Sequence, residues 1–409
     1  MMDSPEGRLP SGVPWLFTRQ GLALLTLTTA IAATFLATDI TFLAGALLVG
    51  GLGAWGWAAL AFARVTYTRR LSRSRAFCGD ELTLESLLSN PRPLPLPWLE
   101  VWEQLPFMLG PQGALEASHT EPDRVWVRRG LALWPYQRLR FRRRLVCRHR
   151  GVFRLGAARL RTGDPFGFFE REQSWHDELE LLVYPRVVPL RRLALPLHHP
   201  SMDVVSPLSP VADPTRTATV RDYRPDDSRR MIHWPTTARR GSLQVRVLEP
   251  ATSLHVSLLL DVRGFLFGMY RGELLELTLS ALASIAVFLQ SKGAPVAFQA
   301  NANPPLVVSP GASVPHLQHV LERLARFEPR PGPALTPWAL DDLPRGNTVV
   351  LASSDVSADL EQSLRQFEDA GLHVLLLLAT NLERGHRRRR GAISLTSGCD
   401  LAAVLEGRA

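Results

Sequence analysis

The sequence predicts a multidomain α/β protein with three main parts: an N-terminal transmembrane helical hairpin, a β-sandwich-like middle domain, and a C-terminal open, mostly parallel α/β sheet. Three observations lead to this prediction. Residues 21–62 contain a single charged side chain, Asp39. Residues 71–192 show short runs in which apolar and polar side chains alternate. Residues 253–409 alternate apolar strands with segments of helical periodicity.

The apolar N-terminal stretch is long enough for two membrane spans, because one span needs only ~20 apolar residues. We expect helices at residues 15–37 and 40–63, with a turn at Thr38 and Asp39. By the positive-inside rule, arginines at both ends of this hairpin predict a multi-pass membrane protein whose termini and remaining domains are cytoplasmic. These arginines are Arg8, Arg19, Arg64, Arg69, Arg70, Arg73 and Arg75. The first predicted domain is therefore residues 1–70.

Residues 71–192 form the predicted β-rich domain. In the stretch RLRFR at residues 138–142, apolar side chains alternate with arginines, as in a strand with one buried face. Several such strands with turns between them are typical of a small β-sandwich. Asp164 begins a Pro-Phe-Gly turn, and we expect it to stabilise that turn rather than to act as a ligand or catalytic acid. A Pro-rich linker follows at residues 193–219.

Residues 253–409 form the predicted open sheet. Strands are expected at residues 254–260, 295–299, 347–352 and 371–378, and helices at residues 273–290, 313–326 and 358–370. Wholly apolar strands that alternate with helices predict a mostly parallel sheet covered on both faces. Ligands bind at the carboxyl ends of the strands in such sheets, which makes Asp261, directly after the first strand, a candidate site residue.

The amino-acid composition limits which classes of function suit this protein. The chain has 409 residues and a net charge of +9, and Lys292 is the one lysine among its 47 basic residues. This skew indicates a codon bias toward arginine rather than a nucleic-acid surface, and a membrane surface or an acidic partner suits the charge at least as well. The three cysteines are far apart in sequence, which argues against a disulfide framework or a zinc site.

Residues 220–252, here called the signature segment, are the densest charged and aromatic stretch. Arginine pairs bidentately with carboxylates and stacks on aromatic rings. Two interpretations follow: an internal Arg–Asp–aromatic clamp between domains, or a docking surface for a partner. The elements R-x-Y-x-P-x-D, R-x-I-H-W, A-R-x-G-x-L and V-R-x-x-E contain the candidate site residues Arg221, Tyr223, Pro225, Asp227, Arg230, His233, Trp234, Arg239, Gly241, Arg246 and Glu249.

These elements resemble the signature of a family of bacterial membrane proteins known as domain of unknown function 58. The sequence departs from the usual pattern at Asp226, Pro235 and Thr237. The resemblance implies no biochemical activity. It implies a partner class, because such proteins are commonly encoded beside MoxR-type AAA ATPases and membrane transglutaminase-like proteins.

The C-terminal part resembles a von Willebrand factor A-type domain. Metal-binding members of that family carry D-x-S-x-S after the first strand, since hydroxyls and a carboxylate form a hard oxygen site for Mg²⁺. The corresponding stretch here, DVRGF at residues 261–265, lacks both hydroxyls and contains Arg263. We therefore expect no metal and no other cofactor, and we expect an ion pair between Arg263 and Asp355 in place of the metal.

The functional hypothesis is a non-enzymatic, membrane-anchored interaction or assembly protein that binds the lipid bilayer and a protein partner. The sequence contains no G-x-x-x-x-G-K-[ST], G-x-S-x-G or H-E-x-x-H motif. One alternative is an enzyme in which His233 is the general base and Asp227 orients it. Another is an Arg-rich nucleic-acid binder, but acidic residues interleave these arginines and weaken phosphate attraction, so no nucleic-acid partner is expected.

Overall fold

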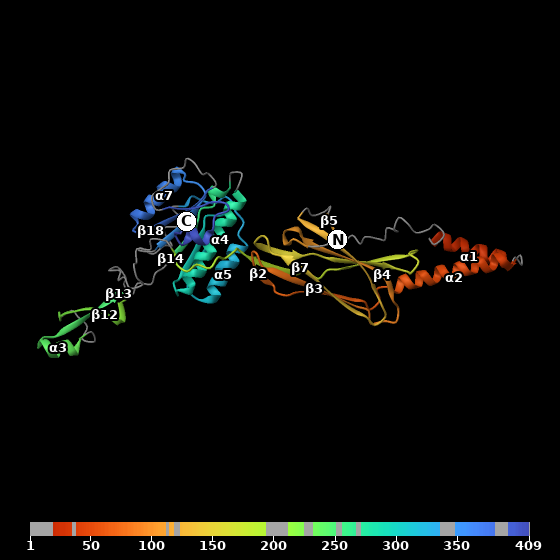
Figure 1. Cartoon of the computed structure of the whole chain (residues 1–409), viewed down its shortest axis with the longest axis horizontal. Coiled ribbons are helices and arrows are strands. Elements are labelled where there is room, and N and C mark those ends of the chain that lie inside the picture. The colour runs from red at the N-terminus through yellow and green to blue at the C-terminus, as the bar shows by residue number, and fades with distance from the viewer. Residues whose placement is uncertain are drawn as a thin grey trace. The chain divides into compact units, whose positions relative to one another are not determined.

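The computed structural model describes residues 19–34, 38–111, 114–117, 123–193, 212–224, 232–250, 256–266, 271–335, 348–380 and 392–408. The chain divides into two compact units, Met1–Tyr184 and Pro185–Ala409. The first unit contains two apolar helices and several mostly antiparallel sheets, and the second contains a hairpin and a six-stranded mixed sheet (Figure 1). The architecture is therefore mixed α/β with several sheets, as the sequence predicts.

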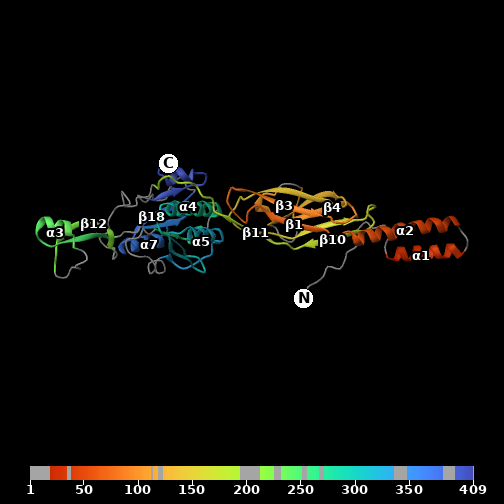
Figure 2. The same cartoon turned by 90° about the horizontal axis from the view of Figure 1, so that it is seen from below.

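Helices α1 (Arg19–Thr34) and α2 (Thr38–Leu60) lie side by side (Figures 1 and 2). The predicted position of the turn is wrong, because Thr38 and Asp39 belong to the first turn of α2. An acidic side chain at a helix N-terminus interacts favourably with the helix dipole, which explains why the helix begins there. Large apolar side chains of α2, such as Phe42, Leu43 and Val49, are exposed.

Two helices in the described part of the chain are long and apolar enough to cross a membrane. One is the stretch Thr41–Leu60 of α2, and the other is α4 (Arg271–Ser291) in the second unit. More than half of α4 is buried inside the second unit, whereas most of the α2 stretch is exposed. Of these two helices, α2 is therefore the one that presents an apolar surface to its surroundings.

Sheets whose strands are mostly antiparallel form the rest of the described part of the first unit. One sheet has the order β1 (Thr66–Leu71), β3 (Glu81–Ser89), β7 (Arg138–Val146). A second has the order β10 (Glu170–Trp175), β9 (Ala158–Gly163), β4 (Leu96–Pro106), β6 (Arg124–Leu133), β5 (Ala114–Ala117). In a third, β11 (Leu179–Tyr184) lies between β2 (Arg75–Phe77) and β8 (Gly151–Leu155) and runs parallel to β2.

Burial alternates along these strands, as expected where one face of a sheet is covered. Leu88 of β3 packs in one core cluster with Leu99 of β4 and Leu160 of β9, so the first two sheets share a core. A second cluster joins Leu84 of β3 with Leu181 of β11. The sheets therefore stack in layers around a common apolar interior.

A polar network lies inside this apolar interior, centred on Glu103 of β4. Glu103 Oε1 accepts hydrogen bonds from Tyr67 Oη (2.5 Å) and Ser86 Oγ (2.7 Å), and its Oε2 lies 3.2 Å from Arg143 Nη2. All four residues are buried. Burial, together with the neighbouring Glu103 charge, raises the pKa of Tyr67 far above its ordinary value. Tyr67 is thus a neutral donor at physiological pH.

The second unit contains a six-stranded sheet in the order β16 (Leu306–Gly311), β15 (Val296–Ala300), β14 (Val256–Leu260), β17 (Thr348–Ser353), β18 (His373–Ala379), β19 (Ile393–Leu395). All neighbouring strands are parallel except β15 and β16. Helix α7 (Ala358–Asp369) packs on one face through Leu360, Leu364 and Phe367. Helices α4 and α5 (Val314–Ala325) pack together on the other face (Figure 1). Helix α8 (Leu401–Leu405) follows β19.

Candidate functional site

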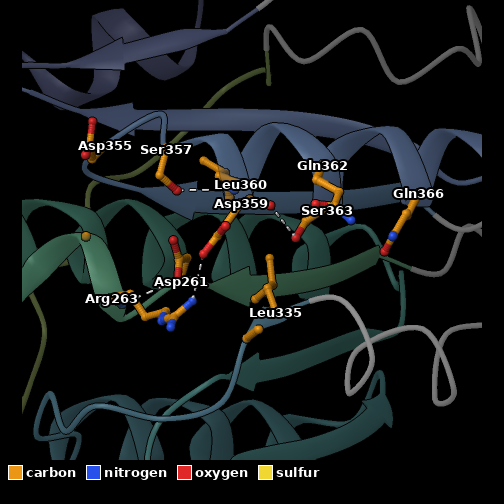
Figure 3. Close-up of a pocket in the computed structure, with 12 residues that line it drawn as sticks. Asp261, Arg263, Leu335, Asp355, Ser357, Asp359, Leu360, Gln362, Ser363 and Gln366 are labelled. Atoms are coloured by element: carbon orange, nitrogen blue, oxygen red, sulfur yellow. Dashed lines mark hydrogen bonds and ion pairs between the residues drawn. The ribbon is translucent and has the colours of Figure 1, made fainter.

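The candidate site lies at the carboxyl edge of the six-stranded sheet. Strand β14 is flanked by β15 on one side and by β17 on the other. The chain continues from β14 to β15 and from β17 to β18, so these two connections lead away from each other. A crevice forms at such a point of divergence. A pocket of about 650 Å³ opens there, lined by residues that follow β14 and by α7 (Figure 3).

Asp261 is buried at the base of this pocket, and its carboxylate is held by donors from three segments. Oδ1 accepts hydrogen bonds from Asn301 Nδ2 (2.9 Å) and from the Arg263 backbone N (3.3 Å). Oδ2 accepts one from Ser353 Oγ (3.1 Å). Because burial of an uncompensated carboxylate is costly, these bonds explain how Asp261 is accommodated.

Asn301 is a site residue that the sequence analysis missed. It follows β15 directly and is fully buried, and its Oδ1 accepts a hydrogen bond from Val262 N (2.7 Å). Its Nδ2 also donates to Pro333 O (3.2 Å). The available signal was its place directly after an apolar strand, which puts it on the same edge of a parallel sheet as Asp261.

Arg263 lies at the mouth of the pocket, in the turn that follows Asp261. Its Nη1 is 3.3 Å from Asp359 Oδ2, in the first turn of α7. The expected partner was Asp355, whose carboxyl points away from Arg263 (Figure 3). The ion pair is therefore with a carboxylate of α7, further along the chain than Asp355. Because both side chains are well exposed, a pair of this kind contributes only ~0–1 kcal/mol to stability.

The residues at this site do not fit a hard divalent cation. Both Asp261 oxygens already accept hydrogen bonds, and Asn301 Oδ1 is engaged by a backbone N–H. Among the described residues, no group of three or more His, Cys, Asp or Glu side chains is placed to hold a metal ion. Oxygen ligands that are free to coordinate are what Mg²⁺ requires. The absence of a metal stays a prediction.

We expect calorimetric titration of the full chain with Mg²⁺ or Mn²⁺ to show no saturable binding from micromolar to millimolar concentrations. The reason is that the Asp261 carboxylate already has hydrogen-bond donors at both oxygens. Asp261→Ala is the matched variant, and its titration should match the parent protein. Micromolar binding by the parent that disappears in Asp261→Ala would contradict this prediction.

The signature segment forms a separate hairpin. Strands β12 (Ala212–Asp222) and β13 (Gln244–Pro250) pair in an antiparallel manner, and α3 (Trp234–Arg240) lies between them in sequence. His233 caps α3, because its Nδ1 accepts from Thr236 N (3.3 Å). Gly241 ends α3 with a φ of 70°, a left-handed conformation that favours glycine. Both residues thus define the ends of one short helix.

The described side chains of α3 lie at the surface of this hairpin. Trp234 is 65% exposed, Arg239 is exposed, and no residue of α3 is buried. Arg221 donates to its neighbour's carbonyl, Asp222 O (3.1 Å), and the Tyr223 backbone N donates to Leu243 O (2.9 Å). A two-stranded hairpin with one short helix has too little interior to bury a dense charged cluster by itself. The clamp between domains and the docking surface therefore both stay predictions.

Gln244 is a second residue that the sequence analysis missed. It is buried, its Nε2 donates to Asp222 Oδ1, and its backbone N donates to Thr237 Oγ1 (3.0 Å). Pro225, Asp227 and Arg230 lie outside the described residues, and Arg246 and Glu249 are described by their backbone alone. The structure therefore does not describe the predicted pairing of His233 with Asp227.

A single family match covers both the signature hairpin and the pocket. Residues 219–380 match the family described as "Protein of unknown function DUF58". This range contains α3, β13 and the pocket around Asp261. Over 318 residues the chain is also 24% identical to the uncharacterized protein YeaD of Bacillus subtilis (strain 168), covering 76% of this chain and 75% of that protein.

Solved structures resemble the chain only weakly. The sporulation control protein Spo0M of Bacillus subtilis is 11% identical with a TM-score of 0.18, over 29% of this chain and 49% of that chain. Proximal thread matrix protein 1 from the mussel byssus is 12% identical with a TM-score of 0.28, over 38% of this chain and 46% of that chain. The chain thus spans less than half the length of each.

Proposed function

We propose that this protein is a non-enzymatic interaction or assembly protein anchored in the bacterial inner membrane. In this proposal α1 and α2 form a transmembrane hairpin, and the rest of the chain lies in the cytoplasm. The observation that carries it is the uncharged stretch Thr41–Leu60, 20 residues long and mostly exposed. At ~1.5 Å per residue, such a helix matches the ~30 Å hydrocarbon core of a bilayer.

The interaction role is supported by the exposed side chains of α3. Trp234, Arg239 and Arg240 are exposed on one short helix whose two ends are capped. Tryptophan and arginine dominate the energetics of protein–protein interfaces, and a rigid element loses little entropy on binding. The partner that the family resemblance implies is a MoxR-type AAA ATPase or a membrane transglutaminase-like protein.

The second unit suits a binding role as well. Its sheet is open and mostly parallel, and we propose that it is von Willebrand factor A-like. Hydrogen bonds from Asn301 and Ser353 take the place of a metal at Asp261, so this domain would bind its partner without a cation. The enzymatic alternative has less support, since the Nδ1 of His233 is engaged in capping α3.

The test of this proposal is Trp234→Ala. We expect this variant to weaken binding of the full chain to a MoxR-type ATPase by about 2 kcal/mol, roughly 30-fold in Kd, because exposed interface tryptophans commonly contribute that much. Its unfolding temperature should stay at the parent value, since the side chain is exposed. Calorimetric titration and a thermal melt measure the two quantities.

Val314→Ala is the matched control, because Val314 is also a large exposed apolar residue of the second unit. It should change neither binding nor stability. Binding by Trp234→Ala at the parent affinity would refute α3 as the docking surface. If Trp234→Ala lowered the unfolding temperature and Val314→Ala did not, the result would support the clamp interpretation of the signature segment.

A further inference from the structure

The C-terminal end of α2 is built into the adjacent sheets. Arg92, in the loop between β3 and β4, donates hydrogen bonds to the carbonyl oxygens of Leu60 and Ala61. The Phe62 ring packs edge-on against Trp175 of β10, with ring centroids 5.7 Å apart. Ala61 belongs to the same core cluster as Leu88 and Leu99. The helix end and the sheets are therefore one packed body.

Two loops meet at this end of the sheets. The loop between β6 and β7 is joined to the loop between β3 and β4 by hydrogen bonds from Tyr136 N to Arg92 O (3.2 Å) and from Asn90 Nδ2 to Trp134 O (3.2 Å). Trp134 and Tyr136 are both exposed, 65% and 69%. Two large aromatic side chains are thus held at the surface beside the arginine that binds the end of α2.

A third loop, between β9 and β10, lies at the same end. Trp98, near the start of β4, donates from its indole N to Asp164 O (3.0 Å). The buried Asp164 carboxylate accepts from Phe166 N (2.9 Å) and Phe169 N (2.6 Å), which confirms its predicted role in the turn. This turn exposes the Phe166 ring, which is stacked on Phe168 with centroids 5.7 Å apart.

These loops lie where a membrane surface would meet the protein. If Thr41–Leu60 spans the hydrocarbon core, the core ends at Leu60, the residue whose carbonyl Arg92 binds. Tryptophan and tyrosine are enriched at the headgroup level, because one end of each ring is apolar and the other is polar. Arg64 and Arg138 are exposed close to these loops in sequence, and guanidinium groups pair well with phosphate.

We propose that the three loops form a membrane-contacting end of the first unit, which inserts Trp134, Tyr136 and Phe166 into the headgroup layer of the bilayer that holds α2. This inference rests on the proposed membrane anchorage. Its occupant is lipid rather than protein, because the surface is continuous with the end of the spanning helix. Arg64 and Arg138 would contact lipid phosphates and hold the sheets in a defined orientation to the membrane.

The test uses tryptophan fluorescence of the full chain in vesicles of phosphatidylcholine and phosphatidylglycerol. Part of the phosphatidylcholine is replaced by lipid brominated near the top of its acyl chain, which quenches tryptophans at the interface. Trp134→Phe is compared with Trp234→Phe, a matched control because both tryptophans are 65% exposed. Subtracting each variant's spectrum from the parent spectrum gives the emission of the tryptophan that was replaced. The emission of Trp134 should be blue-shifted relative to that of Trp234, and the brominated lipid should quench it several-fold more.

Equal quenching of the two difference spectra, in protein that floats with the vesicles, would overturn the inference and leave the anchorage intact. Protein that does not float with the vesicles would refute the anchorage, and the inference with it. Because both tryptophans are largely exposed and phenylalanine keeps an aromatic ring, both variants should melt at the parent temperature.

Discussion

Replacing Glu103 by alanine is expected to lower the free energy of unfolding by about 3–5 kcal/mol, because it removes the carboxylate that compensates a buried arginine. The Glu103 and Arg143 side chains are only 1% and 5% exposed, and their Oε2 and Nη2 atoms lie 3.2 Å apart. The same change removes the acceptor of the Tyr67 and Ser86 hydroxyls. Guanidinium-induced unfolding of the full chain in detergent measures the loss.

The chain offers a matched control on the neighbouring strands. Glu85 of β3 pairs with Arg142 of β7 at 2.6 Å, but these side chains are 34% and 65% exposed. Glu85→Ala should cost only ~0–1 kcal/mol, since water solvates the partner that remains. Similar costs for the two variants would show that Glu103 is not shielded from solvent as the structure indicates.

A reporter protein fused after Ala409 should be active only if it is of a kind that works in the cytoplasm. We expect this result to be all-or-none. Green fluorescent protein should fluoresce there, and alkaline phosphatase should be inactive. The physical reason is the excess of arginine after α2, which favours retention of this side in the cytoplasm. In the folded first unit Arg69 is buried and donates to Gly156 O (2.8 Å), whereas Arg64, Arg70, Arg73 and Arg75 are exposed.

A second fusion between α1 and α2 is the control for this topology. It should report the opposite side of the membrane, with active phosphatase and no fluorescence. Phosphatase activity after Ala409 would show that the orientation inferred from the arginines is inverted. Cytoplasmic signals from both fusions would show that the two helices do not cross the membrane as a hairpin.

Parts of the fold follow directly from sequence pattern. The apolar runs expected at residues 254–260 and 347–352 appear as β14 and β17, because an uninterrupted apolar run must be covered on both faces. Strand β16 was missed, since Pro304 and Pro305 precede a short run whose pairing with β15 is antiparallel. An edge strand of this kind depends on its neighbour more than on its own periodicity.

The sequence by itself determined the apolar helices, the alternating strands and the position of Asp261 after a buried strand, because these depend on local periodicity. Only the tertiary structure decided which polar groups meet. Asn301 and Ser353 reach Asp261 because strand order places β15 and β17 on either side of β14. Glu103 reaches Arg143 because β4 and β7 belong to stacked sheets. Such contacts join residues far apart in the chain, and no local pattern encodes them.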